Sequence, residues 1–315
     1  MRRGPGTHSI LGYGNLRSVT EADARLLKIK SNRTRTTWTA SRLLAVIALI
    51  TQVSGCAHQQ PLGDIAIAPQ FSTEVTVCRD MLANADATEM GELDATNIRL
   101  FSWNVHKTRE QNWRDDLESF ANNADLILFQ EASLREETIS ELDSSRHWTF
   151  APGYRKNGEV TGVMTLSNIK PLTQCSFAHA EPLLRSPKAT SVTQYALSDT
   201  DLTLIVVNVH AVNFSLGLGA FGKQFAQIGD LLEGHEGPVI VSGDLNTWRP
   251  KRAQIIENLA TSHDLTAVAF ADDHRVKFFG NTLDHIYVRG LHALDANTEI
   301  VETSDHNPMS AVFSM

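Results

Sequence analysis

The chain has 315 residues and a formal net charge of −8, with 42% hydrophobic and 20% charged residues. This composition is typical of a globular protein with one large core or two modest ones, and it excludes fibrous and intrinsically disordered classes. Charge is distributed unevenly: residues 1–56 contain nine Lys or Arg and two acids, which leaves 19 basic and 34 acidic residues in 57–315. Such an acidic body repels polyanions at long range, which argues against tight binding of duplex nucleic acid.

Residues 1–56 have the pattern of an export signal. Basic residues up to Arg42 precede an apolar run, 43–50, that is too short to span a bilayer, and the sequence Val-Ser-Gly-Cys then ends at Cys56. This segment resembles a bacterial lipoprotein signal, which implies lipidation of Cys56 and a membrane-anchored protein that faces the periplasm from the cell envelope. The basic region is long for such a signal, and the alternatives are an uncleaved anchor, a buried helix and residence in the cytoplasm.

Residues 57–97 combine scattered Pro, Gly, Asp and Thr with short apolar pieces. We expect a tether followed by some ordered packing around 75–82. If Cys56 is lipidated, Cys78 and Cys175 remain, and an oxidising compartment would allow them to pair. Two cysteines do not define a disulfide framework, so we expect free, buried thiols at both positions.

The folded domain is expected to span residues 98–315, where segments with strand spacing and helix spacing alternate. Helices are predicted at 113–120, 134–142, 223–232 and 252–260. Strands are predicted at 98–104, 125–130, near Trp148, and at 162–166, 191–197, 202–208, 239–242, 283–288 and 309–313. The alternation predicts α/β layers, and the strands that follow one another without a helix favour mixed sheets over an all-parallel sheet.

The stretch VIVSGDLNTW, residues 239–248, joins a buried strand to a glycine turn from which Asp244 and Asn246 project. Open α/β sheets place their chemistry at this end of a strand. A carboxylate there can take a proton or a metal, while an amide two residues on donates a hydrogen bond. A strand that ends in Gly-Asp is also an ordinary turn, so this stretch alone does not identify a site.

Polar residues recur at the ends of the other apolar strands. They comprise amides, carboxylates and imidazoles at Asn104, Gln130, Glu131, Asn208, His210, Asp244, Asn246, Asp284, Asp305 and His306. Carboxylate and amide oxygens are the ligands of hard divalent ions such as Mg²⁺, so this set suits metal-assisted hydrolysis of a phosphate ester. The sequence has neither a Cys/His spacing for zinc nor a glycine-rich phosphate loop.

Six motifs occur in the order SWN, QE, NVH, GDLN, LDH and SDH. As a set they resemble the endonuclease/exonuclease/phosphatase family, which includes DNase I-like nucleases, sphingomyelinases and inositol polyphosphate phosphatases. The resemblance covers about residue 98 to the end of the chain. It implies an α/β fold in which a four-layered sandwich of two mixed β-sheets is flanked by helices. Calcineurin-like phosphoesterases fit poorly, because they require a GNH[DE] element where this chain has GDLN.

The resemblance implies Mg²⁺ as the cofactor, with Mn²⁺ as a substitute. Glu131 would be the principal metal ligand, and Asn104 and Asp305 would lie nearby as ligands or metal-positioning residues. Asp244 would orient or deprotonate the attacking water. Asn246 would hold that water or a phosphate oxygen.

The remaining residues would act on the phosphate and the leaving group. His306 would contact the scissile phosphate, with Asp284 fixing its tautomer and favouring the imidazolium. His210 would protonate the leaving oxygen or stabilise the transition state, supported by Asn208. Gln130 and Asn208 could equally be satisfied amides at strand ends. The resemblance implies no role for two other histidines, which we expect to pack near the site: His106 and His285.

These roles describe a phosphoesterase that uses water as its nucleophile and forms no covalent intermediate. We expect a phosphodiester substrate, because His210 can assist an alkoxide leaving group. A nuclease is the first candidate, a phospholipid or head-group phosphodiesterase or a phosphatase the second, and a non-catalytic envelope binding module the third. Residues 212–221 form either an apolar lip that touches lipid or a loop packed under the next helix. No protein partner is evident, and we expect a monomer.

Overall fold

The computed structural model describes residues 74–85, 91–108, 110, 112–135, 145–156, 158–182, 186–215 and 217–315. The predicted export signal, with its Cys56, and the first part of the predicted tether lie outside these residues. Among the helices that are described, none is both long enough and apolar enough to cross a membrane.

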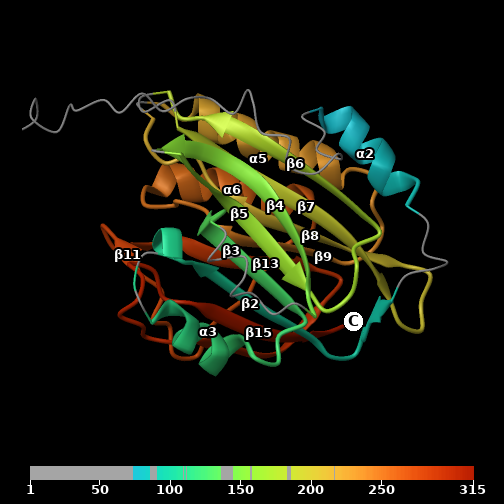
Figure 1. Cartoon of the computed structure of the whole chain (residues 1–315). Coiled ribbons are helices and arrows are strands. Elements are labelled where there is room, and N and C mark those ends of the chain that lie inside the picture. Colours follow the sequence, from blue (N-terminus) through green and yellow to red (C-terminus); the bar gives the residue numbers. More distant parts are fainter. Residues whose placement is uncertain are drawn as a thin grey trace, which may run out of the picture. The chain divides into compact units, whose positions relative to one another are not determined.

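Two mixed β-sheets form the centre of the described chain (Figure 1). The seven-stranded sheet has the order β1-β7-β8-β9-β13-β10, with β6 paired to β7. Its strands are β1 (Glu92–Leu93), β6 (Thr173–Ala180), β7 (Pro187–Leu197), β8 (Thr203–His210), β9 (Val239–Asp244), β10 (Thr266–Ala267) and β13 (Asp284–Arg289).

The six-stranded sheet has the order β14-β15-β2-β3-β5-β4. Its strands are β2 (Ile98–Asn104), β3 (Leu126–Ser133), β4 (His147–Lys156), β5 (Glu159–Ser167), β14 (His292–Thr298) and β15 (Met309–Ser314). A separate hairpin is formed by β11 (Lys277–Phe278) and β12 (Asn281–Thr282). The described helices are α2 (Val75–Ala83), α3 (Trp113–Ala121), α5 (Gly219–Leu232), α6 (Pro250–Ser262) and the 3₁₀ turn η2 (His106–Thr108).

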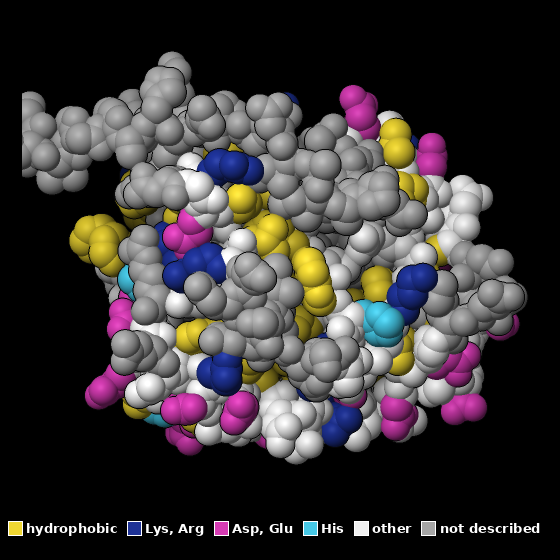
Figure 2. All heavy atoms as spheres, in the orientation of Figure 1, with side chains coloured by type: hydrophobic (Ala, Val, Ile, Leu, Met, Phe, Trp, Pro, Cys, Tyr) yellow, Lys and Arg dark blue, Asp and Glu magenta, His cyan; other side chains and the backbone are white. Residues whose placement is uncertain are grey.

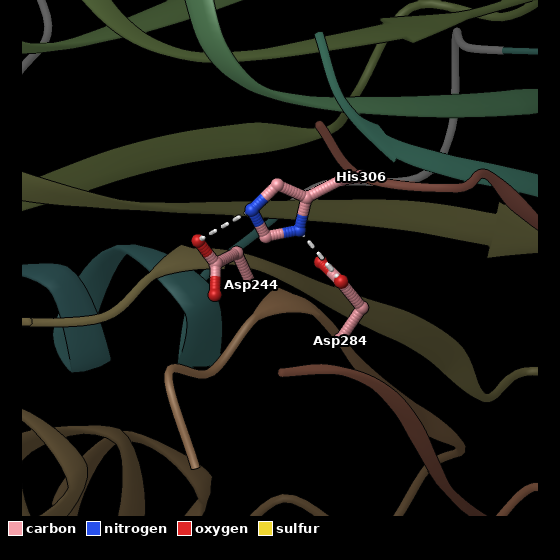
Figure 3. Close-up of side chains that lie close together, drawn as sticks. All are labelled: Asp244, Asp284 and His306. Atoms are coloured by element: carbon pink, nitrogen blue, oxygen red, sulfur yellow. Dashed lines mark hydrogen bonds and ion pairs between the residues drawn. The ribbon is translucent and has the colours of Figure 1, made fainter. Parts of the chain in front are cut away.

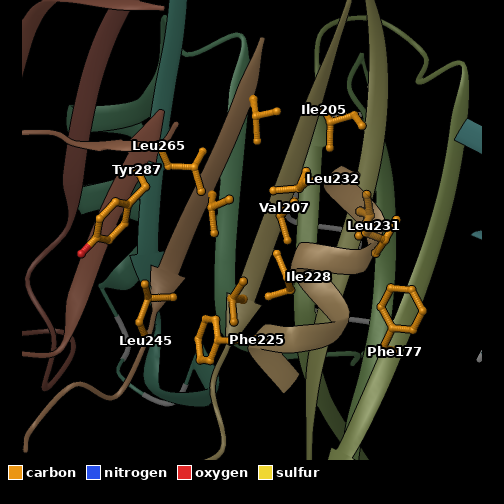
Figure 4. Packing of buried hydrophobic residues seen from close by; sticks show 14 of the residues in the cluster. Phe177, Ile205, Val207, Phe225, Ile228, Leu231, Leu232, Leu245, Leu265 and Tyr287 are labelled. Carbon is orange, nitrogen blue, oxygen red and sulfur yellow. The ribbon is translucent and has the colours of Figure 1, made fainter. Parts of the chain in front are cut away.

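Alternating side chains along the strands separate the layers. Between the sheets, Leu100 of β2 belongs to one buried cluster with Val206 of β8 and Ile240 of β9. The following residues face the opposite way: Phe101 joins the cluster that contains residues of α3, and Val207 joins the cluster with α5 and α6 (Figure 4). The four-layered sandwich of two mixed sheets between helices is therefore confirmed.

Besides the two-residue strands β1, β10, β11 and β12, two longer strands escaped prediction because they lie at sheet edges and have weak apolar alternation. β6 pairs only with β7, and β14 pairs only with β15 among the described strands. Six of the seven residues of β14 are exposed or half-buried, so the strand lacks the hydrophobic pattern of a half-buried edge. A helix was predicted at 134–142, but Leu134 and Arg135 belong to no helix. Residues 136–144 lie outside the described part.

Cys78 and Cys175 form a disulfide, so the prediction of free thiols is wrong. The two cysteines are 97 residues apart in sequence, and their Cα atoms are 5.8 Å apart. Both belong to one buried cluster, in which Cys78 and Leu82 of α2 lie with Cys175 and Phe177 of β6. The sequence alone does not reveal this packing, because β6 was not recognised as a strand. The disulfide attaches α2 to the edge of the seven-stranded sheet.

Candidate active site

The register of the seven-stranded sheet places three of the predicted residues in one row. His210 at the end of β8 pairs with Asp244 at the end of β9, and Asp244 pairs with Asp284 at the start of β13. In the facing sheet, Asn104 ends β2 beside Gln130 of β3. Residues that are distant in sequence therefore meet at one end of both sheets.

Backbone irregularities aim two further side chains into this site. The pairing of β3 with β5 shifts register between Phe129 and Ala132, and Glu131 within this bulge has a φ of 52°. Asn246 has a φ of 51°. Gly243 precedes Asp244 with a φ of 139°, and a Cβ there would collide with the backbone carbonyl of Val209. Left-handed backbone at non-glycine residues stores strain that persists chiefly at functional sites.

His306 and Asp284 form a buried ion pair (Figure 3). Nδ1 of His306 lies 2.7 Å from Oδ2 of Asp284, while Nε2 lies 3.9 Å from Oδ2 of Asp244. Burial opposes the charged imidazole, but the carboxylates of Asp284 and Asp244 raise the pKa of His306 to about 10. His306 is therefore an imidazolium at neutral pH, and its Nε2–H group faces Asp244.

Asp244 is a buried carboxylate held by two hydrogen bonds. Its Oδ1 accepts a hydrogen bond from the backbone N–H of Asn246 at 3.0 Å, and its Oδ2 accepts one from Nδ2 of Asn104 at 3.1 Å. Burial raises the pKa of Asp244 to about 6, although the positive charge of His306 opposes this shift. A carboxylate with that pKa can accept a proton near neutral pH.

Asn246 is fixed by the chain around it. Its Nδ2 donates to the carbonyl of Ala211 at 3.1 Å, which leaves its Oδ1 as a free acceptor among the contacts of the described residues. The buried Arg252 donates from Nη1 to the carbonyls of Asn246 and Val212, at 3.2 and 2.6 Å. Arg252 thus joins the turn after β9 to the segment after β8.

Glu131 faces three cationic or imidazole groups. Lys107 forms an ion pair with its Oε2, while Nζ of Lys188 and Nε2 of His210 lie 3.9 and 3.7 Å from its Oε1. Burial opposes ionisation of Glu131, but its interactions with His210, Lys188 and Lys107 lower its pKa to about 2. Glu131 is therefore an ionised carboxylate throughout the physiological range.

His210 contacts a buried lysine that the sequence did not single out. Nζ of Lys188 lies 2.8 Å from Nε2 of His210, and that same nitrogen lies 3.5 Å from Oδ2 of Asp244. Burial and then the charge of Lys188 lower the pKa of His210 well below its usual value. The neutral imidazole accepts a hydrogen bond from Lys188 at Nε2, which places its own proton on Nδ1.

Two of the predicted site residues have their contacts elsewhere. Asn208 is buried between the sheets, where its Nδ2 donates to the carbonyls of Met164 and Phe129 at 3.0 and 3.3 Å and its Oδ1 accepts from Gln130 at 2.8 Å. This bonding matches the satisfied amide that was the alternative reading of Asn208. The side chain of Asp305 is 64% exposed, and its carboxylate lies 3.8 Å from Nδ1 of His106.

His285 and His106 lie at the margin of the site. Nε2 of His285 lies 2.6 Å from Oγ1 of Thr247, which follows the central motif, and burial lowers the pKa of His285 to about 4. His285 thus helps to hold the turn after β9. His106 lies in η2, and its backbone N–H donates to Oδ1 of Asn104 at 3.2 Å.

The oxygen donors of the site fit a hard divalent cation. Glu131 is ionised and its side chain is 15% exposed, and the Asn104 amide donates a hydrogen bond to the Asp244 carboxylate. Ligand atoms of Asp244, Asp284 and His306 also lie within 4.8 Å of one another. Asp284 is already paired with Nδ1 of His306. The better candidate ligands for a divalent cation are therefore Glu131 and Asn104. The residue that now neutralises Glu131 is a lysine, so a cation bound there has to displace Lys107.

Sequence reasoning missed both lysines of the site. Lys188 is the second residue of β7, at the start of a strand rather than at its end. Lys107 reaches Glu131 from η2, where three successive residues, His106, Lys107 and Thr108, have positive φ angles. Lys107 stands three residues after the SWN motif, but nothing in the local pattern predicts the left-handed turn that directs it inward.

Comparisons with known proteins agree with this geometry. Residues 101–306 match the model of the Endonuclease/Exonuclease/phosphatase family. A UPF0294 protein from Klebsiella pneumoniae (strain 342) is 39% identical over 218 residues, which cover 69% of this chain and 82% of that protein.

Solved structures share the fold at low sequence identity. An endonuclease/exonuclease/phosphatase family protein from Leptotrichia buccalis C-1013-b has a TM-score of 0.53 and 17% identity, over 69% of this chain and 100% of its own. The human Nocturnin catalytic domain with bound sulfate anion has a TM-score of 0.52 and 19% identity, over 72% and 96% of the two chains. The chain therefore belongs to the endonuclease/exonuclease/phosphatase family, whose members are metal-dependent phosphoester hydrolases.

Proposed function

We propose that this enzyme hydrolyses phosphodiesters with the help of Mg²⁺, by in-line attack of water on phosphorus and without a covalent intermediate. One observation carries the proposal: a cationic imidazole and a buried carboxylate lie next to one another. Nε2 of His306 and Oδ2 of Asp244 are 3.9 Å apart, and His306 is held as an imidazolium by Asp284. A phosphate oxygen needs the cation, and the attacking water needs the base.

Asp244 is the group that takes the proton from water. Its pKa of about 6 makes it ionised at neutral pH yet basic enough to accept a proton. The hydrogen bonds from Asn104 and from the backbone of Asn246 fix the carboxylate. Oδ1 of Asn246 accepts the second hydrogen of the same water, which orients a lone pair of the water oxygen toward phosphorus.

His306 and Lys188 act on the phosphate and the leaving group. His306 donates from Nε2 to a non-bridging oxygen, where charge grows in the transition state. Because Nε2 of His210 accepts from Lys188, the proton that can reach a leaving alkoxide is carried by the Lys188 ammonium rather than by His210. His210 then positions the ammonium group, which refines the role first expected for the histidine.

Glu131 and Asn104 would hold the metal ion. When bound, Mg²⁺ supplies positive charge that stabilises the developing charge on the phosphate oxygens. Mn²⁺ would serve in its place, since both ions favour carboxylate and amide oxygens. The exposed carboxylate of Asp305 would reach the ion only through water or after a movement of its side chain.

A nuclease remains the first specific activity that we propose. The ammonium groups of Lys107 and Lys188 give the site local positive charge within an acidic body. A phospholipid or head-group phosphodiesterase is the second candidate, favoured by exposed aromatic side chains beside the site at Phe278 and Phe279. We also propose that the enzyme is exported and anchored at the cell envelope through Cys56, as a monomer.

A substrate panel tests the proposal. The full chain is assayed on plasmid DNA, single-stranded DNA, sphingomyelin and bis-p-nitrophenyl phosphate, with Mg²⁺ or with EDTA. We expect metal-dependent hydrolysis of at least one diester that is lost in Glu131→Ala and His306→Ala. Hydrolysis that persists in EDTA, or in both variants, would contradict the proposed site. Absence of turnover on every diester would favour a narrow phosphatase or the non-catalytic binding module.

A further inference from the structure

An exposed group of aromatic side chains lies beside the candidate active site. It consists of the exposed Phe214, Phe278 and Phe279 and the half-buried Trp248, and we call it the aromatic rim. Phe279 is 80% exposed, and Phe214 and Phe278 are 52% and 51% exposed. Hydrophobic side chains protrude at the edge of the molecule in Figure 2, at the place where Figure 1 labels β11. Exposed apolar groups that are gathered in one place mark interaction surfaces.

The rim is held in place by contacts between its members. The rings of Phe278 and Phe279 lie 4.4 Å apart, and the ring of Trp248 meets Phe278 edge-on at 6.3 Å. Nε1 of Trp248 donates to the Asn213 side chain at 2.9 Å, which joins the tryptophan to the segment that carries Phe214. These contacts, rather than burial in the core, therefore hold the rings in place.

The hairpin that carries Phe278 and Phe279 is hydrogen-bonded to the turn after β9. Oγ1 of Thr247 donates to the carbonyl of Thr282 at 2.5 Å, and Nδ2 of Asn281 donates to the carbonyl of Trp248 at 3.2 Å. β12 ends only two residues before Asp284, the partner of His306. A surface that binds the rim would therefore lie beside the active site.

Cationic side chains flank the aromatic rings. The guanidinium of Arg249 lies 3.9 Å from the centre of the Trp248 ring, and Arg249 and Lys251 are exposed. Lys277 precedes the two phenylalanines; its side chain is 49% exposed, and its Nζ lies 3.9 Å from Oδ2 of Asp273. Aromatic rings beside Lys and Arg are the composition that proteins place at the boundary between lipid head groups and acyl chains.

We propose that the aromatic rim docks on a lipid bilayer, with Phe278 and Phe279 inserted among the acyl chains and the flanking cations at the head-group phosphates. Phenylalanine has no polar group, so its transfer from water to hydrocarbon leaves no donor or acceptor unpaired. The docking requires no hydrolysis. Only its consequence, that the enzyme meets its phosphodiester at a membrane surface, rests on the proposed function.

Other occupants fit the rim less well. A single-stranded nucleic acid could stack its bases on the rings, but the body outside the first 56 residues has 34 acids against 19 bases and repels a polyanion. A stable protein partner needs about 800 Å² on each side. Three phenylalanines, each with roughly 200 Å² of surface that is already partly buried, offer less than that.

The predicted lipid anchor agrees with this occupant. Cys56 is separated from the first described residue, Glu74, by 17 residues. A chain of that length reaches at most about 60 Å when fully extended. An anchor at Cys56 would therefore hold Glu74 within about 60 Å of the membrane.

Vesicle binding in EDTA tests the proposal without any turnover. The full chain carries Cys56→Ser, so that no lipid is attached, and is mixed with vesicles of phosphatidylcholine with or without phosphatidylglycerol. We expect Phe278→Ser/Phe279→Ser to weaken binding at least about tenfold. The control Leu294→Ser/Ile300→Ser removes two side chains that are 62% and 69% exposed elsewhere and should leave binding unchanged. Equal affinity of the hairpin variant and its parent overturns the proposal, provided that their melting temperatures agree.

A probe in the hairpin supplies a second readout. In the Cys56→Ser chain, with Cys78 and Cys175 paired, Phe279→Cys offers one free thiol for an environment-sensitive dye. We expect vesicles to shift the dye emission to the blue and brominated acyl chains to quench it, whereas a dye at Leu294→Cys stays in water. A dye at residue 279 that responds to single-stranded DNA but not to vesicles would assign the rim to nucleic acid and overturn membrane docking. Loss of hydrolysis in Asp244→Asn with unchanged vesicle binding would separate docking from catalysis.

Discussion

The ammonium group of Lys188 lies 2.8 Å from Nε2 of His210, at the point where β7 and β8 meet the active site. This contact decides which of the two groups can give a proton. His210 is neutral and presents an acceptor nitrogen, so the available proton belongs to Lys188. The same ammonium lies 3.9 Å from Glu131, which keeps its charge close to the carboxylate expected to bind metal.

Replacing Lys188 with Met is expected to lower kcat about 100-fold, because the leaving oxygen loses its cationic donor. Lys188→Arg keeps the charge but not the compact ammonium, and should retain an intermediate rate. The rates are measured with bis-p-nitrophenyl phosphate and with a diester that has a poorer alkoxide leaving group. The defect should be larger for the poorer leaving group, and an equal defect for both would contradict proton donation.

Replacing Asp284 with Asn is expected to move the alkaline limb of kcat/KM to lower pH. Asp284 helps to raise the pKa of His306 from 6.5 to about 10, so without this carboxylate the imidazolium is lost earlier as pH rises. The ion pair stabilises the folded protein fully below pH 6.5, and this contribution disappears as pH rises through 10. The variant should therefore melt lower than the parent at pH 6, with a difference that shrinks above pH 10. A pH–rate profile identical to that of the parent would show that Asp284 does not control His306.

Replacing Glu131 with Gln is expected to abolish the stabilisation of the fold by Mg²⁺. A ligand that binds only the folded state raises the melting temperature in proportion to the logarithm of its concentration. The parent should show this rise, and Glu131→Gln should not. Glu233→Gln is the matched control, since Glu233 is 74% exposed and pairs with Arg79 away from the site. If Mg²⁺ shifts the melting temperature of Glu131→Gln as much as that of the parent, Glu131 is not the principal ligand.

Replacing Lys107 with Met is expected to tighten Mg²⁺ binding. The lysine neutralises Glu131 in the metal-free protein, and the Glu131 carboxylate raises the pKa of Lys107 although burial opposes that shift. An incoming cation no longer has to break this ion pair in the variant. Titration calorimetry measures the affinity directly, without turnover. Weaker binding in Lys107→Met would mean that the lysine organises the metal site instead of competing for it.

Replacing Cys78 and Cys175 with Ser together is expected to reduce the free energy of unfolding by about 2–4 kcal/mol. The bond closes a loop of 97 residues, so its loss restores much freedom to the unfolded chain. Urea denaturation of the double variant, and of the parent with and without reductant, measures the effect. A parent whose stability does not respond to reductant would contradict a disulfide in the folded protein.

The sequence predicted the central strands and most of the site because one pattern encodes both. Asp244 and Asn246 follow one apolar run and Asp284 begins another, and strand register alone then brings Asp244 beside Asp284. Lys188 stands at the beginning of its strand, where a lysine is ordinarily solvated. The burial of Lys188 depends on the facing sheet, and the local sequence pattern does not predict it.

Other features depend on backbone irregularity or on surface shape. Lys107 points inward only because its turn adopts positive φ angles, and Glu131 turns inward only at a bulge. Phe278 and Phe279 read as an ordinary apolar pair, and only their exposure distinguishes them from core residues. Asn208 was expected to support His210, but its amide is used between the sheets, since an amide at a strand end serves packing as readily as chemistry.

The most direct test of the central claim is the rate of bis-p-nitrophenyl phosphate hydrolysis by the parent, Asp244→Asn and Asp201→Asn. Asp201 is an exposed acid that precedes β8 and has no part in the site. With Mg²⁺, the parent and Asp201→Asn should turn over equally, Asp244→Asn should be slower by about 100-fold or more, and EDTA should stop all three. Equal rates for Asp244→Asn and Asp201→Asn, or hydrolysis that continues in EDTA, would contradict a metal-dependent site in which Asp244 activates water.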